Sequence, residues 1–510
     1  MKPAAKSMGF RIASVLLMSL LSVYGVCAQD MSAPLDDNIL FGGSADIVRV
    51  IDTETASSGT VNLVTEEKRY PVFLVEGGAS VAFSGDFTPI GATVKDKQSL
   101  VGTLAVRGLS IDFLPAENIH FGTSLDATVS GAGLDKIAID GFADMRASEF
   151  SRLYGSGGFS YSASGTPEFS LDELFVDAAM DRILFFRLGK QHIRWGVGTW
   201  FQPSDVLSLA AIDPDDPSAA REGPFAFKVD MPFGLNHASL YVVPSGTGDP
   251  GEIAGAARTD LVVGGWELSL GAFARSDMEA RPRAMFMFTG TLGDIDTYGE
   301  AVAALGSDRL YVRDTGGGTY GTYTRDYEAV FQATVGFSYD WRSSGGLSVG
   351  LQAQGYYNGT GYADPSIQNI AGAKAVLGDG YDLRESGLWY AAGRLSLSAQ
   401  LGEDETIGVG LSINGIANIS DGSVTFTPAF SLSLGDQGSA LDLAMSAKTM
   451  LGGPGTEYGS KSGTMVTPAL SATIMDVVTA SVQAPLTLGA GSAVDKADIN
   501  FSLSWKGMSI

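Results

Sequence analysis

The fold is decided by residues 423–434, which read SVTFTPAFSLSL. Apolar residues take every second position, and small or hydroxyl-bearing residues fill most of the positions between them. Successive side chains of an extended strand point to opposite faces of a sheet, so this stretch predicts a strand with one apolar and one polar face. Similar alternation covers residues 394–401, 407–414, 441–448, 466–474, 478–488 and 499–505.

Short turn sequences separate these runs, which indicates an antiparallel meander. Several runs reach about the ten residues that a tilted strand needs to cross a bilayer. Ser, Thr, Gly and Gln on the other face suit a water-filled interior. A soluble β-sandwich also alternates and is the rival interpretation, but we favour a transmembrane antiparallel up-and-down β-barrel, whose sheet leaves no unpaired edge in lipid.

The upstream part of the chain adds less regular strand candidates. Together with the seven C-terminal runs they come to roughly 20, and because bacterial barrels prefer even numbers we expect about 18 strands, with 16–20 allowed. Three long connections, 202–224, 292–328 and 358–388, are expected on the outer side of the membrane, and one of them is a candidate to fold inward. The upstream candidates are 46–53, 70–76, 101–113, 119–129, 136–145, 171–180, 182–193, 225–231, 237–243, 260–274, 283–291, 329–340 and 346–357.

The N-terminal segment has the layout of an export signal. Lys2, Lys6 and Arg11 precede an apolar run, and small residues end it at Cys27-Ala28. We therefore predict a removed signal peptide over 1–28, a short N-terminal segment over 29–45 and the barrel over 46–510. Lipidation of Cys27, the single cysteine of the chain, stays open as an alternative.

The strongly acidic composition limits the partners of the protein. With 57 acidic against 33 basic side chains, the formal net charge is −24, which excludes nucleic acid as a plausible partner. The expected location is the outer membrane, and the expected partners are its lipid, the barrel assembly machinery and small hydrophilic solutes. A homo-oligomer is left open.

The segment 171–205 carries a resemblance to a known group of proteins. It contains Gly189-Lys190-Gln191, three further residues, Trp195-Gly196, and then the run 201–205, which reads FQPSD. This pattern resembles porin-like outer-membrane barrels, including alginate-export-type and related uncharacterised families, in which such a strand leads into an aromatic-Asn-Pro-x-Asp loop. Gln202 departs from the pattern. The resemblance implies a porin-like barrel and names no substrate.

Strand parity in the same hairpin predicts which side chains face inward. If Val176 and its even-numbered neighbours face lipid, then Glu173, Asp177, Arg187 and Gln191 face the lumen. Asp177 and Arg187 lie close to cross-strand register, and opposite charges within a narrow lumen would set pore selectivity. A structural ion pair is the equally weighted alternative.

Three aromatic residues, Trp195, Trp200 and Phe201, follow this strand. We expect them to belong to the aromatic girdle at the membrane interface. A platform that stacks against sugars is the alternative interpretation.

Catalytic and metal-binding patterns are weak. Residues 346–350 match a nucleophile elbow and residues 316–321 a dinucleotide fingerprint, but neither lies before a predicted helix. The histidines His120, His192 and His237 lack metal-ligand spacing, and the acidic loop 213–216 fits no calcium loop. We expect no enzyme, no cofactor and no metal site.

These observations predict an outer-membrane porin or channel that passes small solutes through a water-filled lumen, with a mild cation preference if the carboxylates line the pore. The alternative is a non-conducting structural or adhesive surface barrel with long acidic extracellular loops. An exporter that works with a periplasmic partner is a weaker third hypothesis.

Overall fold

The computed structural model describes residues 71–505, apart from 86–99, 131–132, 149–150, 163–164, 209–211, 218–220, 245–251, 278–279, 403–405, 436–438, 460–462, 475–477, 489–493 and 498. The predicted signal peptide, the N-terminal segment 29–45 and the strand candidate 46–53 lie outside the described residues. They stay predictions.

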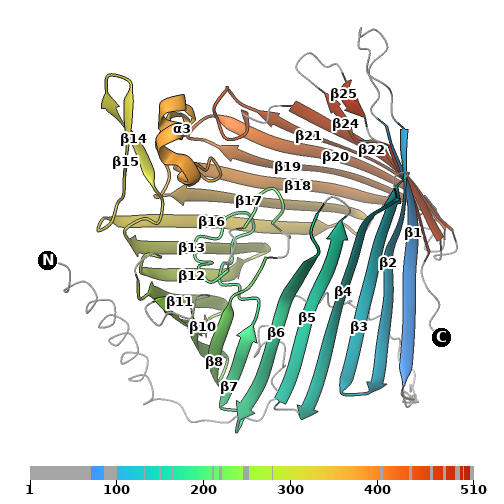
Figure 1. Cartoon of the computed structure of the whole chain (residues 1–510), viewed down its shortest axis with the longest axis horizontal. Coiled ribbons are helices and arrows are strands. Elements are labelled where there is room, and N and C mark those ends of the chain that lie inside the picture. The colour runs from blue at the N-terminus through green and yellow to red at the C-terminus, as the bar shows by residue number, and fades with distance from the viewer. Residues whose placement is uncertain are drawn as a thin grey trace.

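The described residues form one antiparallel sheet of 24 strand elements and a separate two-stranded hairpin (Figure 1). The first half of the large sheet consists of β1 (Val72–Gly85), β2 (Leu100–Ala116), β3 (Ile119–Ser130), β4 (Gly133–Ser148), β5 (Ser151–Ser162), β6 (Glu168–Met180), β7 (Leu184–Lys190), β8 (Phe225–Phe233), β9 (Asn236–Val243), β10 (Ala254–Val263), β11 (Trp266–Arg275), β12 (Arg283–Leu292) and β13 (Ile295–Leu305). The second half consists of β16 (Ala329–Arg342), β17 (Leu347–Asn358), β18 (Trp389–Leu401), β19 (Ile407–Asn418), β20 (Ser423–Gly435), β21 (Ala440–Leu451), β22 (Gly463–Ile474), β23 (Val478–Gln483), β24 (Leu486–Leu488), β25 (Val494–Ala497) and β26 (Ile499–Trp505).

The strands follow one another around the sheet in chain order, which is the up-and-down barrel topology that the sequence predicts. β1 pairs with β2 on one side and with β26 on the other, so the pairing continues from the last strand to the first. β23 and β24 both pair with β22 and read as one strand interrupted near Pro485. β25 and β26 pair with these two and form the next strand. Counted in this way, the 24 elements of the described part of the chain make 22 strands.

The expected number of about 18 strands is therefore too low. β5 reads SRLYGSGGFSYS and β13 reads IDTYGEAVAAL, and neither shows an apolar residue at every second position. The candidate 260–274 holds parts of two strands, because Gly264 and Gly265 adopt positive φ angles of 59° and 84° and form a tight turn between β10 and β11. Glycine reaches such angles at little cost, so the turn lies inside what reads as one run.

The alternating pattern places apolar side chains on the outer face of the sheet. On β19, Leu411 and Ile413 are 45% and 43% exposed, whereas Ser412 between them points inward and is half-buried. Large apolar side chains recur in this way on the outer face of most strands. A continuous apolar outer face of this kind is what a sheet in contact with lipid requires. Among the described residues, no helix has the length and apolar character to cross a bilayer.

Short turns join the strands at one end of the sheet, and longer connections lie at the other. The connection 306–328 forms the hairpin of β14 (Tyr311–Gly316) and β15 (Thr319–Tyr323). The connection 359–388 forms the helical turns η2 (Pro365–Asn369), α3 (Ala371–Leu377) and η3 (Gly378–Gly380). The two connections pack together through Tyr311, Val312, Tyr362, Ala373 and Leu377. In outer-membrane barrels the long connections face outside, so we expect these two packed connections on the outer side of the membrane.

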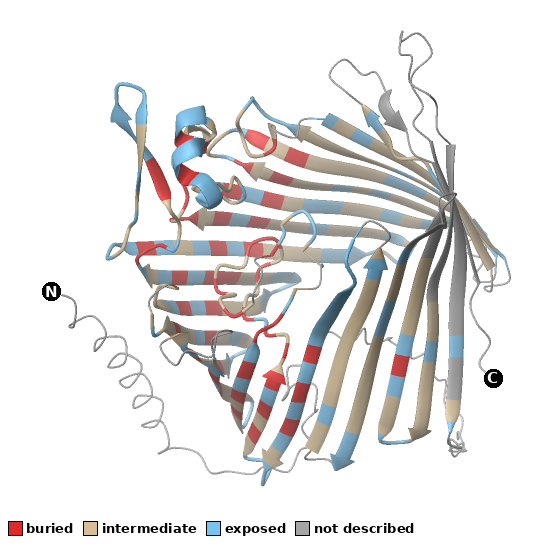
Figure 2. Ribbon diagram, viewed as in Figure 1, coloured by how far each residue is buried: buried red, intermediate tan, exposed pale blue. Residues whose placement is uncertain are grey.

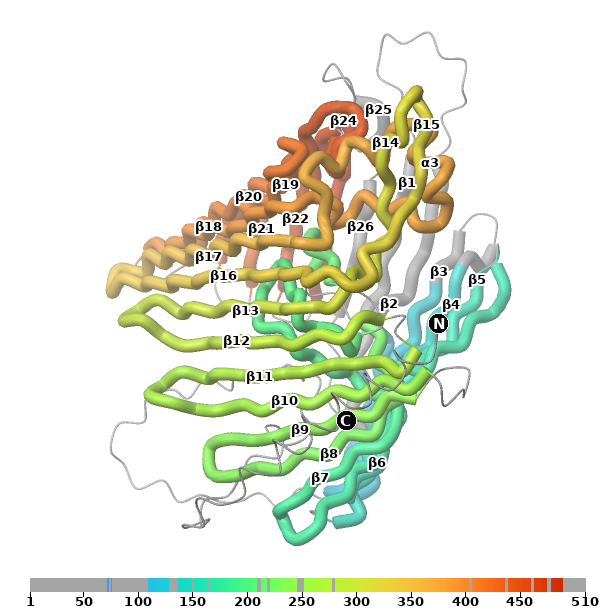
Figure 3. Tube along the Cα trace, turned by 90° about the vertical axis from the view of Figure 1, so that its left-hand side faces the viewer, coloured from blue at the N-terminus to red at the C-terminus, as the bar shows by residue number. Residues whose placement is uncertain are grey.

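The remaining long connection, between β7 and β8, does not lie with the other two. The described residues of 191–224, here called the inner segment, leave the wall at the end of β7 and lie inside the barrel before β8 begins (Figure 3). Of the three long connections predicted from the sequence, 202–224 is thus the one that folds inward. Buried residues concentrate in this segment and in the strands beside it (Figure 2).

The two faces of β19 give a matched test of the membrane orientation. Leu411→Arg places a charge on the outer face near the middle of the strand, and we expect it to lower the free energy of unfolding in liposomes by about 2–4 kcal/mol. Ser412→Arg points inward and serves as the control, with an expected loss of about 1 kcal/mol or less. Denaturant titration of both variants measures the difference, and equal losses would contradict the assignment of the two faces.

Candidate functional site

The inner segment begins where the strand pattern of β7 is interrupted. Gly189 has a φ of 141°, and a Cβ atom there would lie 2.0 Å from the carbonyl oxygen of Leu174 on β6. Beyond Lys190 the chain turns into the barrel, with Trp195 1%, Trp200 5% and Phe201 1% exposed. The prediction that these three aromatic residues form an interface girdle is therefore wrong, because the chain has left the wall before it reaches them. Their burial also excludes them as a sugar-stacking platform.

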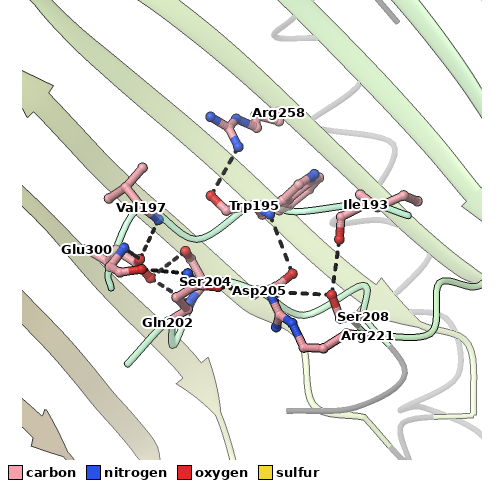
Figure 4. Close-up of polar contacts among 11 residues, drawn as sticks. Ile193, Trp195, Val197, Gln202, Ser204, Asp205, Ser208, Arg221, Arg258 and Glu300 are labelled. Carbon is pink, nitrogen blue, oxygen red and sulfur yellow. Dashed lines mark hydrogen bonds and ion pairs between the residues drawn. The ribbon is translucent and has the colours of Figure 1, made fainter. Parts of the chain in front are cut away.

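A single carboxylate on the wall holds the centre of the inner segment (Figure 4). Glu300 of β13 points inward and is 3% exposed. Its Oε1 atom accepts hydrogen bonds from the backbone N–H groups of Val197 at 2.6 Å and Gly198 at 2.7 Å. Its Oε2 atom accepts from the N–H of Ser204 at 3.0 Å and from the hydroxyl of Ser204 at 2.6 Å. Charge-assisted bonds of this kind are the strong ones, so Glu300 fixes the segment against β13.

An amide on β17 makes the second attachment. The Oε1 atom of Gln354 accepts from the N–H groups of Thr199 at 3.1 Å and Trp200 at 2.8 Å. Its Nε2 atom donates to the carbonyl oxygen of Phe201 at 2.7 Å. The ring of Phe201 stacks on Tyr356, two residues further along β17, with 4.8 Å between ring centroids. Hydrogen bonds and ring stacking thus both attach residues 199–201 to β17.

Further contacts join the segment to β10 and to itself. Arg258 of β10 donates to the carbonyl oxygen of Trp195 at 3.1 Å (Figure 4). Within the segment, Asp205 accepts from Arg221 at 2.5 Å and from the hydroxyl of Ser208 at 2.9 Å. These bonds tie the outgoing and the returning halves together, so the segment is a folded element.

The inward parity predicted for the β6–β7 hairpin agrees with the structure. Asp177 and Arg187 stand directly opposite each other, and two parallel hydrogen bonds of 2.7 and 2.9 Å join their side chains. Both side chains are 3% exposed. The Arg187 guanidinium also lies 3.8 Å from the ring centroid of Phe175.

The other two predicted residues attach the start of the inner segment. Glu173 Oε1 accepts from the N–H of His192 at 3.0 Å, and Gln191 Nε2 donates to the carbonyl oxygen of Ala226 on β8 at 3.1 Å. Glu173 is 5% and Gln191 1% exposed. All four predicted residues are therefore buried, and two of them, Glu173 and Gln191, hold the start of the inner segment.

Sequence reasoning missed Glu300, Gln354 and Arg258. Strand parity assigns an inward direction to Gln354, but the alternation of β13 is too weak to place Glu300. No local signal reveals that either side chain receives a segment about 100 to 150 residues earlier in the chain. Only the folded structure brings these groups together.

The histidines and the acidic loop are separate features. His120 contacts Asp112 at 3.0 Å and His237 contacts Asp260 at 2.8 Å, on different strands. Asp215 pairs with Lys448 of β21 at 2.9 Å. In the part of the chain that the structure describes, no group of three His, Cys, Asp or Glu side chains could hold a metal ion.

A second polar junction lies among the long connections. Glu457, in the connection after β21, accepts hydrogen bonds from the N–H of Glu385 at 3.0 Å, the hydroxyl of Tyr390 at 2.8 Å and the amide of Asn418 at 2.9 Å. Burial raises the pKa of Glu457 above its ordinary value. Burial and the nearby Glu457 carboxylate raise the pKa of Glu385 to about 7, although Arg309 opposes the shift.

An up-and-down antiparallel sheet with an apolar outer face and long connections at one end defines an outer-membrane β-barrel protein. No family model and no curated protein matches the chain. Among solved structures, the chain is similar to the siderophore receptor PirA from Pseudomonas aeruginosa, with 11% identity, coverage of 86% of this chain and 82% of that chain, and a TM-score of 0.46. The siderophore receptor PirA from Acinetobacter baumannii is 8% identical, with coverage of 86% of this chain and 81% of that chain and a TM-score of 0.46. OccK10 (OpdN) from Pseudomonas aeruginosa is 8% identical, with coverage of 86% of this chain and 100% of that chain and a TM-score of 0.30.

Removal of the Glu300 carboxylate tests the attachment of the inner segment. In Glu300→Ala, three backbone N–H groups lose their acceptor, and each charged hydrogen bond is worth about 1.5–3 kcal/mol. We expect hydrogen exchange at Val197, Gly198 and Ser204 to accelerate roughly tenfold or more. Gln352→Ala, a change of an inward residue two positions from Gln354, is the control. Unchanged exchange in Glu300→Ala would show that other contacts hold the segment.

The junction of Glu385 and Glu457 predicts a pH dependence. Because the folded-state pKa of Glu385 is raised from 4.5 to about 7, the folded junction binds more protons than the unfolded one in this range, and its stability falls as the pH rises from about 4.5 to 7. Hydrogen exchange of residues 452–459, normalised to intrinsic rates, should be slower at pH 5 than at pH 7.5.

In Glu385→Gln most of this pH dependence should vanish, because the side chain no longer ionises. Exchange that slows with rising pH in the native protein would contradict the assignment.

Proposed function

We propose that the protein is an outer-membrane channel for small polar solutes, in which the inner segment narrows the passage. The observation that carries this proposal is the attachment of residues 191–224 inside the barrel by Glu300 and Gln354. A folded segment held at several points on the wall is suited to define the width of a passage. The proposed role is transport and not catalysis.

The inner face of β20 and β21 supports a hydrated path beside the segment. The inward-facing side chains of β20 and β21 include Ser431, Ser433 and Ser446, which are half-buried or exposed. The segment is attached to β10, β13 and β17, and its Asp215 also pairs with Lys448 of β21 at 2.9 Å, whereas Ser431 and Ser433 lie further along the wall and keep accessible hydroxyl groups. Small hydroxyl groups hold water without closing the space.

The motif at 189–205 supports the same proposal. It is the part of the chain that resembles porin-like barrels of the alginate-export type, and it forms the start and centre of the inner segment. We propose that the motif builds a constriction. Gly189 allows a backbone conformation next to the end of β7 that other residues could not adopt, and the aromatic residues bury the segment against the wall. Assembly by the barrel assembly machinery and any homo-oligomer stay predictions.

Conductance measurements test the channel. Native protein in planar bilayers should give stepwise currents. The double variant Glu300→Ala/Gln354→Ala should give larger or noisier steps, since it removes both attachments of the segment. Gln352→Ala is the matched control and should conduct like native protein. Absence of any current from correctly folded native protein would favour a non-conducting surface barrel with acidic loops.

We propose further that the Asp177–Arg187 pair positions the β6–β7 hairpin and does not select ions. Both side chains are nearly inaccessible and satisfy each other. Arg187→Ala should leave the cation-to-anion permeability ratio unchanged. It should lower the free energy of unfolding by about 3–5 kcal/mol, since it leaves a buried carboxylate unpaired. A changed permeability ratio in a variant of native stability would restore the selectivity role.

A further inference from the structure

A row of rings lies on the part of the inner wall beside the inner segment. His120 of β3, Phe142 of β4, Tyr154 of β5 and Phe175 of β6 follow one another across four adjacent strands. The ring centroids are 4.8 Å apart for His120 and Phe142, 6.4 Å for Phe142 and Tyr154, and 5.2 Å for Tyr154 and Phe175. The last two pairs are stacked, with interplanar angles of 22° and 29°.

Strand register explains why these rings share one face. Tyr154 stands opposite Phe175 on β6, and Phe142 stands opposite Gly122 on β3. A Cβ atom on Gly122 would lie 2.2 Å from the Phe142 ring, so the glycine provides the space that the ring occupies. The neighbouring residue of opposite parity on β5, Leu153, points outward and is 39% exposed.

Polar side chains accompany the row, and each of them has a partner. Asp112 contacts His120 at 3.0 Å, and their side chains are 31% and 38% exposed. Asp144 accepts two hydrogen bonds from Arg152, at 2.8 and 3.0 Å. The Arg152 guanidinium lies 5.0 Å from the Tyr154 ring centroid. The row thus has hydrogen-bond donors and acceptors beside its rings.

Accessibility changes along the row. Phe175, next to the start of the inner segment, is 4% exposed, whereas Phe142 and Tyr154 are only half-buried. The burial colouring shows the same contrast, with mostly intermediate residues on β3 to β5 and many buried ones on β6 and β7 (Figure 2). The row therefore emerges from the buried region into the accessible interior.

We propose that this row binds a neutral solute built of hydroxylated rings, that is, a saccharide. Aromatic faces accept the apolar faces of such rings, and the flanking carboxylate and guanidinium groups can exchange hydrogen bonds with hydroxyls. Asp144 already pairs with Arg152, and Arg152 occupies the position over Tyr154 that a cationic ligand would take. The inference rests on the proposed channel, for which it names the substrate class.

Two measurements on the full-length protein test the row. Calorimetric titration of the detergent-solubilised protein with maltotriose reports binding whether or not the protein conducts. Block of the single-channel current by maltotriose reports binding within the passage. In the double variant Phe142→Ala/Tyr154→Ala, the affinity for maltotriose should fall about tenfold in both measurements. In Tyr154→Phe, which retains the ring, the affinity should stay within about twofold of the native value.

The control variant is Phe121→Ala. Phe121 lies on the outer face of β3, where it is 37% exposed and stacks on Phe113, so its loss should leave maltotriose binding unchanged. Circular dichroism confirms that each variant is folded. Binding without current would support the row and overturn the channel.

Three results would overturn the row. The first is current without maltotriose binding in native protein, and the second is equal binding by the double variant. The third is stronger block by tetramethylammonium than by maltotriose, which would point to an organic cation as ligand.

Discussion

The structure depends on one constraint, which is that backbone N–H and C=O groups within lipid must all be paired by the protein itself. An antiparallel sheet whose first strand pairs with its last satisfies this constraint along the wall. The same sheet then separates its side chains by parity, apolar outward and polar inward. The period of two in residues 423–434 is the direct sequence expression of this separation.

The backbone groups of the inner segment must also be paired, but no neighbouring strand is available to pair with them. Residues that leave the wall need other partners for their backbone groups, and the wall supplies them through inward side chains. Glu300 and Gln354 together accept hydrogen bonds from five backbone N–H groups of the segment. Apolar packing of Trp195 and Phe201 excludes water around these bonds. A polar interior can thus hold a folded segment as firmly as an apolar core would.

The sequence predicted the barrel class and the inward parity of Glu173, Asp177, Arg187 and Gln191, because both depend on local alternation. It underestimated the number of strands because β5 and β13 are rich in small residues and do not alternate clearly. It misplaced Trp195, Trp200 and Phe201, since aromatic residues after a strand are typical of an interface as well as of a buried turn. Contacts that join distant parts of the chain, such as Glu300 with Gly198, have no local signature. For the same reason, the row from His120 to Phe175 becomes visible only when register places its four strands side by side.

The most direct test of the account is a cysteine scan of residues 423–434 in lipid vesicles, one substitution at a time. Each cysteine is labelled with a fluorophore that lipid-borne quenchers can reach, and in parallel with a membrane-impermeant maleimide. The account predicts strong lipid quenching at 424, 426, 430, 432 and 434, and reaction with the soluble reagent at the serines between them. Quenching and reactivity without a two-residue period would contradict a wall with lipid on one face and water on the other.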